Sequence, residues 1–238
     1  MRILAIDTSV GSGSVAASDE RGLSERPLGP AGSHARVLTA ALADMAAARG
    51  WGDHTTAIPS LGSHDVIAVV SGPGSFTGLR VGVTAAKALA WTTGARLVAV
   101  SGFEVLARQA ATALRCHAGP FVVAYDAGRG EVYTATVTRP PSGWSVGPAA
   151  LMAVDAWIDA VPTGSRLTGP GLDAIVDRLA SRGDLWIATP ELRYPSAGET
   201  AATARERAEA GLFDDPLTLV PNYLRPSYAE ERKPAVDG

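Results

Sequence analysis

One glycine-rich stretch constrains the fold of this chain more than any other part of its sequence. Residues 71–94 read SGPGSFTGLRVGVTAAKALAWTTG and follow an apolar run at residues 66–70. The run predicts a buried strand, and the glycines and proline after it predict a sharp turn. A helix should follow and should end at Gly94, which stands where a left-handed cap belongs. Its predicted apolar face, at helical spacing, consists of Leu79, Val83, Ala86 and Ala90.

A second row on the same predicted helix has almost no side chains. Gly78, Gly82, Ala86 and Ala90 recur at every fourth residue. Each glycine inside a helix costs about 1 kcal/mol relative to alanine, so some packing partner should compensate for this cost. The row therefore predicts that another helix packs unusually close to this one.

The composition is that of an ordinary globular protein. The chain has 238 residues, enough for one large domain or two smaller ones, and a net charge of −3. It lacks the basic excess of a protein that binds nucleic acid by itself. A single cysteine, Cys116, excludes an internal disulfide framework. Because no secretory signal is recognisable and no apolar run approaches about 20 residues, we expect a soluble, cytoplasmic protein without a membrane partner.

The first residues predict a β-hairpin with a polar turn. Residues 3–6 form an apolar run that ends in Asp7, Thr8 and Ser9, and a turn through Gly11 and Gly13 leads into residues 14–18. Such a turn can present backbone amides to a phosphate while the aspartate holds a magnesium-bound water. It can equally be a plain hairpin. These residues alone do not decide between the two interpretations.

A similar unit occurs in the second half of the chain. An apolar run at residues 121–125 leads to Asp126, a turn through Gly128 and Gly130, and an alternating run at residues 131–138. The repetition predicts two related halves with a boundary near residue 104. We therefore expect lobes at residues 1–104 and 105–225, followed by a tail at residues 226–238.

The histidines give no clear metal site. A helix is predicted at residues 33–49, and His34 lies one turn before Leu38 on its apolar side. A pair of metal ligands on one helix needs a second ligand four residues after the first, and Leu38 stands at that position. A partly buried histidine at a helix end is therefore favoured. The loop at residues 51–64 contains His54, beside Asp53, and His64, beside Asp65, but at spacings that predict solvated surface.

Later segments give weaker predictions. Residues 166–168 predict a strand that leads through Gly169, Pro170 and Gly171 into a helix. This turn either approaches a nucleotide or is needed for chain geometry alone. The charged segment at residues 199–210 predicts a solvated helix, and residues 217–225 should close the fold.

Five motifs, in this order along the chain, resemble the bacterial TsaB (YeaZ) family. They are the opening IDTS, GPGSFTGLR, VSGFEVLA, YDAGRGEVY and PNYLR. The resemblance implies an α/β fold with two lobes of the actin-like, sugar-kinase and Hsp70 type (the ASKHA fold), in which each lobe is a mixed sheet with flanking helices.

The resemblance also implies a function and partners. Proteins of this family are non-catalytic subunits of the machinery that makes N6-threonylcarbamoyladenosine in tRNA. They bind and activate the transferase TsaD, together with the ATPase TsaE, contact tRNA only through the complex, and form homodimers when alone. A nucleotide, ATP or ADP, is a possible ligand at the subunit junction. The implied partner interface comprises His34, Leu38, Leu42, Met45, Phe76, Thr77, Leu79, Arg80, Gly82, Val83 and Ala86.

Two other functions compete with this one. A small-molecule kinase or ATPase of the same fold would use Asp7, Thr8 and Asp126 as magnesium and phosphate ligands, but Arg129 and Glu131 crowd the second turn. A metallopeptidase would need about three suitably spaced metal ligands. The catalytic relative TsaD has an H-x-x-x-H metal pair on the helix that matches residues 33–49, whereas Leu38 follows His34 here. We therefore expect no metal.

Overall fold

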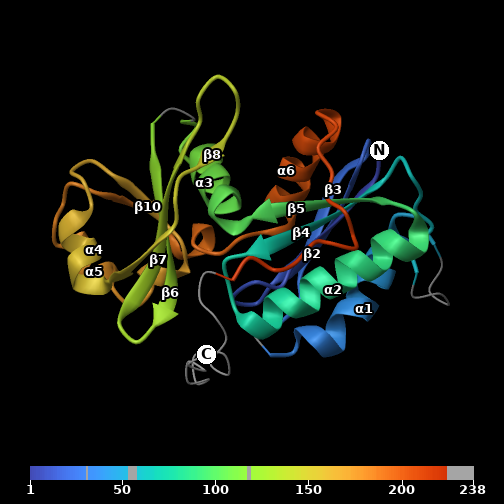
Figure 1. The fold of residues 1–238 in the computed structure, drawn as a ribbon, viewed down its shortest axis with the longest axis horizontal. Coiled ribbons are helices and arrows are strands. Elements are labelled where there is room, and N and C mark those ends of the chain that lie inside the picture. Colours follow the sequence, from blue (N-terminus) through green and yellow to red (C-terminus); the bar gives the residue numbers. More distant parts are fainter. Residues whose placement is uncertain (31, 53–57, 117–118, 224–238) are drawn as a thin grey trace, which may run out of the picture.

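Two β-sheets, each at the centre of one lobe, organise the chain (Figure 1). The computed structural model describes residues 1–30, 32–52, 58–116 and 119–223. Asp53 and His54, and the predicted tail at residues 226–238, lie outside the described residues. Within the described residues, no helix combines the length and the apolar character needed to cross a membrane.

The first sheet combines a three-stranded antiparallel unit with two parallel strands. Its strands are β1 (Ile3–Asp7), β2 (Ser14–Asp19), β3 (Gly22–Pro27), β4 (Val66–Gly72) and β5 (Arg96–Ser101), in the order β3-β2-β1-β4-β5. The central strand β1 pairs antiparallel with β2 and parallel with β4, so that Ile3 lies opposite both Ser18 and Val66. The predicted opening hairpin and the predicted strand before the glycine-rich turn are confirmed.

The second sheet repeats this arrangement. Its strands are β6 (Phe121–Gly128), β7 (Glu131–Thr138), β8 (Ser145–Val146), β9 (Ala150–Ala153), β10 (Arg166–Thr168) and β11 (Trp186–Ile187). The order β11-β10-β6-β7-β8 matches that of the first sheet, with an antiparallel hairpin on one side of β6 and parallel strands on the other. The strand β9 pairs with β7. The predicted repetition of two related halves is confirmed.

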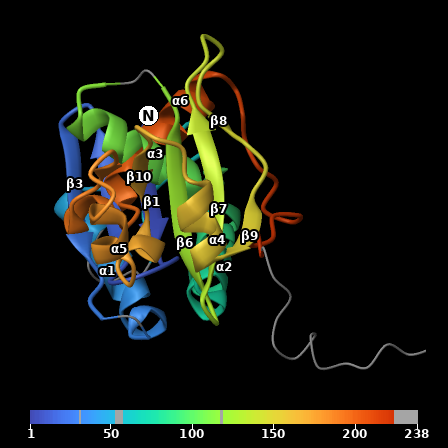
Figure 2. The ribbon, with the colours of Figure 1, turned by 90° about the vertical axis from the view of Figure 1, so that its left-hand side faces the viewer.

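Helices cover both faces of each sheet. The helices α1 (His34–Ala48) and α2 (Phe76–Thr93) lie on one face of the first sheet, and α6 (Ala197–Glu209) lies on the other. The helix α3 (Gly102–Ala113) packs against the second sheet, whose opposite face carries α4 (Val154–Ala160) and α5 (Val176–Ala180) (Figure 2). Short 3-10 turns occupy Pro170–Leu172 and Pro190–Leu192.

Local chemistry sets both ends of α2. The side chain of Ser75 accepts a hydrogen bond from the amide of Gly78, which caps the start of the helix. At the other end Gly94 has a φ of 73°, a left-handed conformation that glycine adopts at little cost. The apolar face of α2, including Val83 and Ala86, is buried against the first sheet together with that of α1. The predicted helix and its cap are confirmed.

The glycine row of α2 packs against the chain's own first sheet, which corrects its predicted role. A Cβ at Gly78 would overlap the backbone oxygen of Thr8, and a Cβ at Gly82 would overlap the Oγ1 of Thr8. Both glycines, with Ala86 and Ala90, are buried within the chain. The close packing partner is therefore the end of β1 and not another helix. The spacing of the row identified a shared face correctly but could not identify what covers that face.

The helix α6 is buried on one side, whereas the sequence predicts a solvated helix. Ala197, Ala201 and Ala204 lie in the core on the first sheet. Farther along the chain, Asp214 forms a β-bridge with Leu97 of β5. The first lobe therefore contains residues from both ends of the chain, and the predicted assignment of all of residues 105–225 to the second lobe is wrong.

Candidate functional site

A cleft between the lobes brings together the turns of the two hairpins. It has a volume of about 790 Å³. Val10 and Gly11 line it from the first lobe, and Asp126 and Gly171 line it from the second. The ring of Tyr194 lies against Gly11, where a Cβ would approach the ring Cδ1 to 2.7 Å. Both glycine turns that the sequence singles out in the second half of the chain therefore reach this cleft.

Asp7 does not reach the cleft. Its side chain is fully buried, and its Oδ1 accepts hydrogen bonds from the amide and the hydroxyl of Ser9 at 2.9 and 2.6 Å. Its Oδ2 has no partner among the described residues. Burial raises the pKa of this carboxyl group to about 7, against the opposing effect of the Ser9 hydrogen bonds. A carboxylate enclosed in this way is poorly placed to hold a solvated magnesium ion.

The other candidate phosphate ligands are also engaged within the chain. Thr8 is buried, and its Oγ1 donates a hydrogen bond to the carbonyl oxygen of Gly78 at 2.7 Å. Asp126 is exposed, and its Oδ1 accepts a hydrogen bond from the amide of Gly128 at 2.7 Å. The structure thus separates Asp126, on the cleft wall, from the enclosed Asp7. It does not assemble the magnesium site that the kinase interpretation requires.

His34 occupies the first position of α1 and is 6% exposed. Its Nε2 donates a hydrogen bond to the carbonyl oxygen of Ser12 at 3.0 Å, because a carbonyl oxygen can only accept. The expectation of a partly buried histidine at a helix end is confirmed. Among the described residues there is no group of three His, Cys, Asp or Glu side chains that could hold a metal ion.

Most residues of the implied partner interface are buried inside the first lobe. This group consists of His34, Leu38, Leu42, Met45, Leu79, Gly82, Val83 and Ala86. Phe76 is half-buried, while Thr77 and Arg80 are exposed. The buried side chains hold α1 and α2 on the sheet, so they are unable to contact a partner directly. The sequence selected the apolar faces of the two helices, which are the faces that a single lobe needs for its own core.

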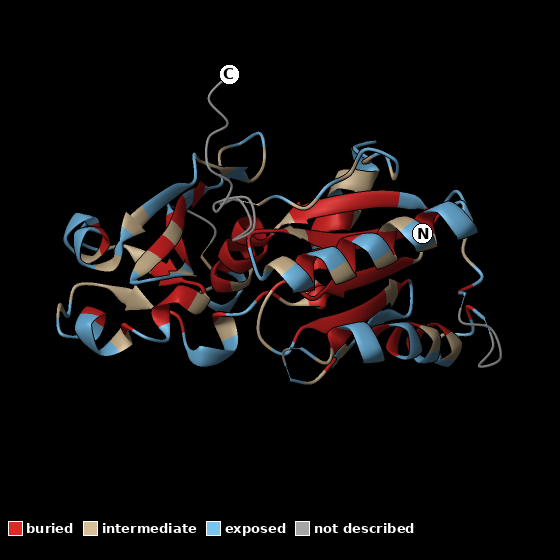
Figure 3. Cartoon of the chain, turned by 60° about the horizontal axis from the view of Figure 1, so that its bottom comes forward, coloured by how far each residue is buried: buried red, intermediate tan, exposed pale blue. Residues whose placement is uncertain are grey.

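The outer faces of α1 and α2 are formed by other residues. On α1 the exposed positions include Thr39, Ala40 and Asp44, and on α2 they include Thr84 and Ala88. Figure 3 shows exposed bands along the outward sides of these two helices, with buried strands behind them. Most of these side chains are small and uncharged, so another helix could approach closely.

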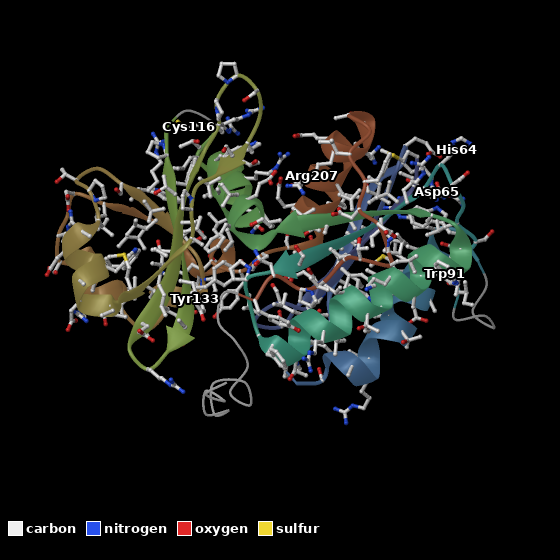
Figure 4. All side chains as sticks on the ribbon, in the orientation of Figure 1. His64, Asp65, Trp91, Cys116, Tyr133 and Arg207 are labelled. Atoms are coloured by element: carbon white, nitrogen blue, oxygen red, sulfur yellow. The ribbon has the colours of Figure 1, made fainter. Side chains whose placement is uncertain are left out.

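Trp91 adds a large apolar side chain to this surface. It lies near the C-terminal end of α2 and is 69% exposed (Figure 4). Sequence reasoning did not select Trp91 or the small exposed residues. Helical spacing is the signal that could have found them, because these positions fall outside the apolar face of the same helix.

The C-terminal segment lies along α2. Arg80 donates a hydrogen bond from Nε to the hydroxyl of Tyr223 at 3.0 Å, and its guanidinium lies 3.9 Å from the centre of the Phe76 ring. The rings of Phe76 and Tyr223 are 4.7 Å apart between centroids. Farther along α2, the Nζ of Lys87 donates to the carbonyl oxygen of Leu219 at 2.8 Å. Arg80 and Lys87 therefore bind the chain's own C-terminal segment.

Comparison with known proteins gives a family for this chain. The family model described as TsaD, tRNA N6-adenosine threonylcarbamoyltransferase, matches residues 57–211. The tRNA threonylcarbamoyladenosine biosynthesis protein TsaB of Bacillus subtilis is 33% identical over 175 residues, which cover 70% of this chain and 72% of that protein. The chain belongs to the TsaB (YeaZ) family. The resemblance drawn from the five sequence motifs is confirmed.

Other relatives match this TsaB-family chain over nearly its whole length. An uncharacterized protein of Mycobacterium tuberculosis is 32% identical over 231 residues, which cover 94% of this chain and 91% of that protein. The structure of YeaZ from Pseudomonas aeruginosa has a TM-score of 0.74 at 23% identity and covers 94% of this chain and 99% of that one. The predicted α/β class, with two lobes that each contain a mixed sheet and flanking helices, is confirmed.

Proposed function

We propose that this TsaB-family chain takes part in tRNA threonylcarbamoyladenosine biosynthesis in the cytoplasm, as a non-catalytic subunit that binds and activates TsaD. TsaE binds the resulting pair, and tRNA is contacted through the complex. The family membership supports the pathway, because the Bacillus subtilis relative is a biosynthesis protein for this modified nucleoside. The match to the TsaD family model supports a partner of related fold.

The outer faces of α1 and α2 are the proposed binding surface for TsaD. They lie side by side and expose small side chains, such as Ala40 and Ala88, together with the large side chain of Trp91. A partner helix can approach such a surface closely, and the free-energy cost of removing water from charged groups is small. The exposure of these side chains carries the proposal, because the buried faces of both helices already pack against the sheet.

The surface is long enough for a stable interface. The helices have 15 and 18 residues, so at about 1.5 Å per residue they present rods of roughly 22 and 27 Å. A standard interface buries about 800 Å² on each partner. A second copy of this chain would use the same surface, and homodimer and heterodimer would therefore compete.

A non-catalytic role agrees with the arrangement of the carboxylates. A kinase or ATPase needs metal-bound phosphates next to its carboxylates, whereas Asp7 is enclosed and has no exposed oxygen. We therefore infer that the transferase chemistry belongs to TsaD and that this chain acts by holding TsaD in its active form.

The test is a reconstituted tRNA modification assay with TsaD, TsaE and this chain. Omission of the chain should abolish formation of threonylcarbamoyladenosine. The variant Thr84→Arg, which places a long charged side chain on the exposed face of α2, should reduce the rate strongly. The matched control is Ala156→Arg, an exposed position on α4 in the other lobe, and it should behave as the wild type. Full modification without this chain would overturn the proposal.

A further inference from the structure

Each lobe buries one oxygen atom that has no hydrogen-bond partner. These atoms are Oδ2 of Asp7, at the end of β1 in the first lobe, and the hydroxyl oxygen of Tyr125, on β6 in the second lobe. Asp7 is 0% exposed and Tyr125 is 2% exposed. Across the described residues, only the hydroxyl of Thr203 shares this condition. A buried polar atom that stays unpaired costs free energy, so this pair of atoms requires an explanation.

Asp7 and Tyr125 are neighbours across the seam between the lobes. The strands β1 and β4 pair in parallel, in a register that places Asp7 beside Val70. Val70 in turn lies against Gly102, because a Cβ at Gly102 would lie 3.4 Å from Cγ1 of Val70 and would overlap the hydroxyl of Tyr125. Burial raises the pKa of this hydroxyl, and the negative charge of Asp7 raises it further. The two unpaired oxygens therefore lie on either side of the same contact.

Gly102 lies where the chain crosses from the first lobe to the second. It follows β5 directly and begins α3, which packs against the second sheet. The chain returns to the first lobe before Ser196, whose side chain caps the start of α6. A rotation of the lobes about these two crossings changes the separation of Asp7 and Tyr125, because the two residues belong to different sheets.

Each side chain is held in place by its own surroundings. Oδ1 of Asp7 accepts hydrogen bonds from the amide and the hydroxyl of Ser9, which fix the plane of the carboxyl group. The ring of Tyr125 packs edge-on against the ring of Phe103, with 5.3 Å between the centroids, in the apolar core of the second lobe. Both unpaired oxygens therefore have fixed directions, and a movement of one lobe relative to the other is the motion that brings them together.

We propose that Asp7 and Tyr125 form an interlobe latch, which closes when the hydroxyl of Tyr125 donates a hydrogen bond to Oδ2 of Asp7. The arrangement in Figure 1 is the open one, and a small rotation of the lobes toward each other closes it. The hydroxyl donates and the carboxylate accepts, so neither buried atom stays unpaired. Val10 and Asp126, which line the interlobe cleft, lie within three residues of Asp7 and Tyr125 along the chain. The latch therefore sets the width of the cleft.

The sign of the stability change in Tyr125→Phe tests the interlobe latch. Removal of a hydroxyl that stays unpaired stabilises the chain, whereas removal of one that donates to Asp7 destabilises it. We expect the unfolding equilibrium constant of Tyr125→Phe, measured in urea at about pH 8, to exceed that of the wild type about fivefold. Tyr194→Phe, which removes the hydrogen bond from Tyr194 to Asp173, is the matched control and should also be destabilised. A Tyr125→Phe variant at least as stable as the wild type would overturn the proposal.

The ionisation of Asp7 gives a readout that a purely structural role of the Tyr125 ring would not change. Burial raises the pKa of Asp7 to about 7, the hydrogen bonds from Ser9 lower it, and the charge of Glu25 on β3 raises it. A hydroxyl that donates to the charged carboxylate lowers this pKa, so Tyr125→Phe should raise it further. Carbon-resolved NMR of the Asp7 carboxyl group over about pH 4–9 measures the change. An unchanged pKa in Tyr125→Phe would contradict the hydrogen bond.

Spin labels in the two lobes measure the restraint on lobe movement. Ala88 on α2 and Ala156 on α4 are exposed positions in different lobes. In a Cys116→Ser background, labelled cysteines at these positions should show a broader distribution of distances with Tyr125→Phe than without it. Identical distributions would show that the pair does not restrain the lobes and would overturn the proposal. Because these measurements use the chain alone, the interlobe latch and the proposed binding of TsaD can fail separately.

Discussion

Gly82 of α2 and Thr8 at the end of β1 approach so closely that no side chain fits between them. A Cβ at Gly82 would overlap Oγ1 of Thr8 and would lie 3.6 Å from methyl carbons of both Ile6 and Val69. The same Oγ1 donates to the carbonyl oxygen of Gly78, one turn earlier in α2. The glycine row therefore seats α2 on its own sheet, and the surface that we propose for a partner lies on the opposite side of the helix.

The first prediction concerns this contact. Gly82→Ala should destabilise the chain, because overpacking costs about 1–3 kcal/mol, which exceeds the gain of about 1 kcal/mol in helix propensity. Gly82→Trp should prevent folding. Unfolding in urea measures the free energy of unfolding of each variant. Ala88→Gly, at an exposed position of the same helix, is the control. A Gly82→Ala variant more stable than the wild type would contradict the packing.

The second prediction concerns the pH dependence of stability. Burial raises the pKa of Asp7 from its ordinary value of 3.8 to about 7 in the folded chain. Between these values the folded chain binds more protons than the unfolded chain, so stability should fall as the pH rises, by up to about 4 kcal/mol in total. Asp7→Asn removes the charge, so the stability of this variant should change less with pH over this range. Thermal unfolding measured over about pH 4–8 tests this prediction. If stability fell with pH at the same slope in the wild type and in Asp7→Asn, that result would argue against the enclosed carboxyl group.

The third prediction concerns Arg108, which joins α3 to α6. Its side chain is 8% exposed, and its Nε donates to Glu199 at 2.8 Å while its Nη2 donates to Glu206 at 2.6 Å. Arg108→Ala leaves the partly buried Glu199 without its cation and should cost about 3–5 kcal/mol. Removal of the exposed pair between Arg178 and Asp155 by Arg178→Ala should cost less than about 1 kcal/mol. Similar losses in the two variants, measured in urea, would be inconsistent with a buried ion cluster.

The fourth prediction concerns the C-terminal segment on α2. Tyr223→Ala removes the ring that packs on Phe76 and the hydroxyl that accepts from Arg80, and should cost about 1–2 kcal/mol. Amide exchange in residues 215–223 should become faster. Tyr223→Phe keeps the ring contact and loses only the hydrogen bond, so its effect should be smaller. Unchanged exchange in Tyr223→Ala would show that these contacts do not hold the segment.

The parts of the fold that were predictable from sequence depend on local signals. The hairpin from Asp7 to Ser14, the strand before Gly72 and the cap at Gly94 each follow from a pattern within a few residues. The repetition of the hairpin predicted two related halves, and the matching strand orders confirm it. These signals act through backbone conformation and burial, which neighbouring residues largely determine.

The remaining features depend on contacts between distant residues. The buried face of α6 is made of Ala197, Ala201 and Ala204, and small side chains do not distinguish a buried face from an exposed one in a charged segment. The glycine row shows the same limit, because its spacing does not specify whether the sheet or another subunit covers it. The contact between Arg80 and Tyr223 joins residues that are 143 positions apart, and no local pattern predicts it.

Calorimetric titration of TsaD with this chain tests most directly the proposal that the outer faces of α1 and α2 bind TsaD. The wild type and the control Ala156→Arg should bind with the same affinity. Thr84→Arg, folded by circular dichroism and as stable as the wild type, should bind at least about tenfold more weakly, because the interface cannot close around a charged side chain. Equal affinity of Thr84→Arg and the wild type would show that TsaD binds elsewhere and would contradict the claim.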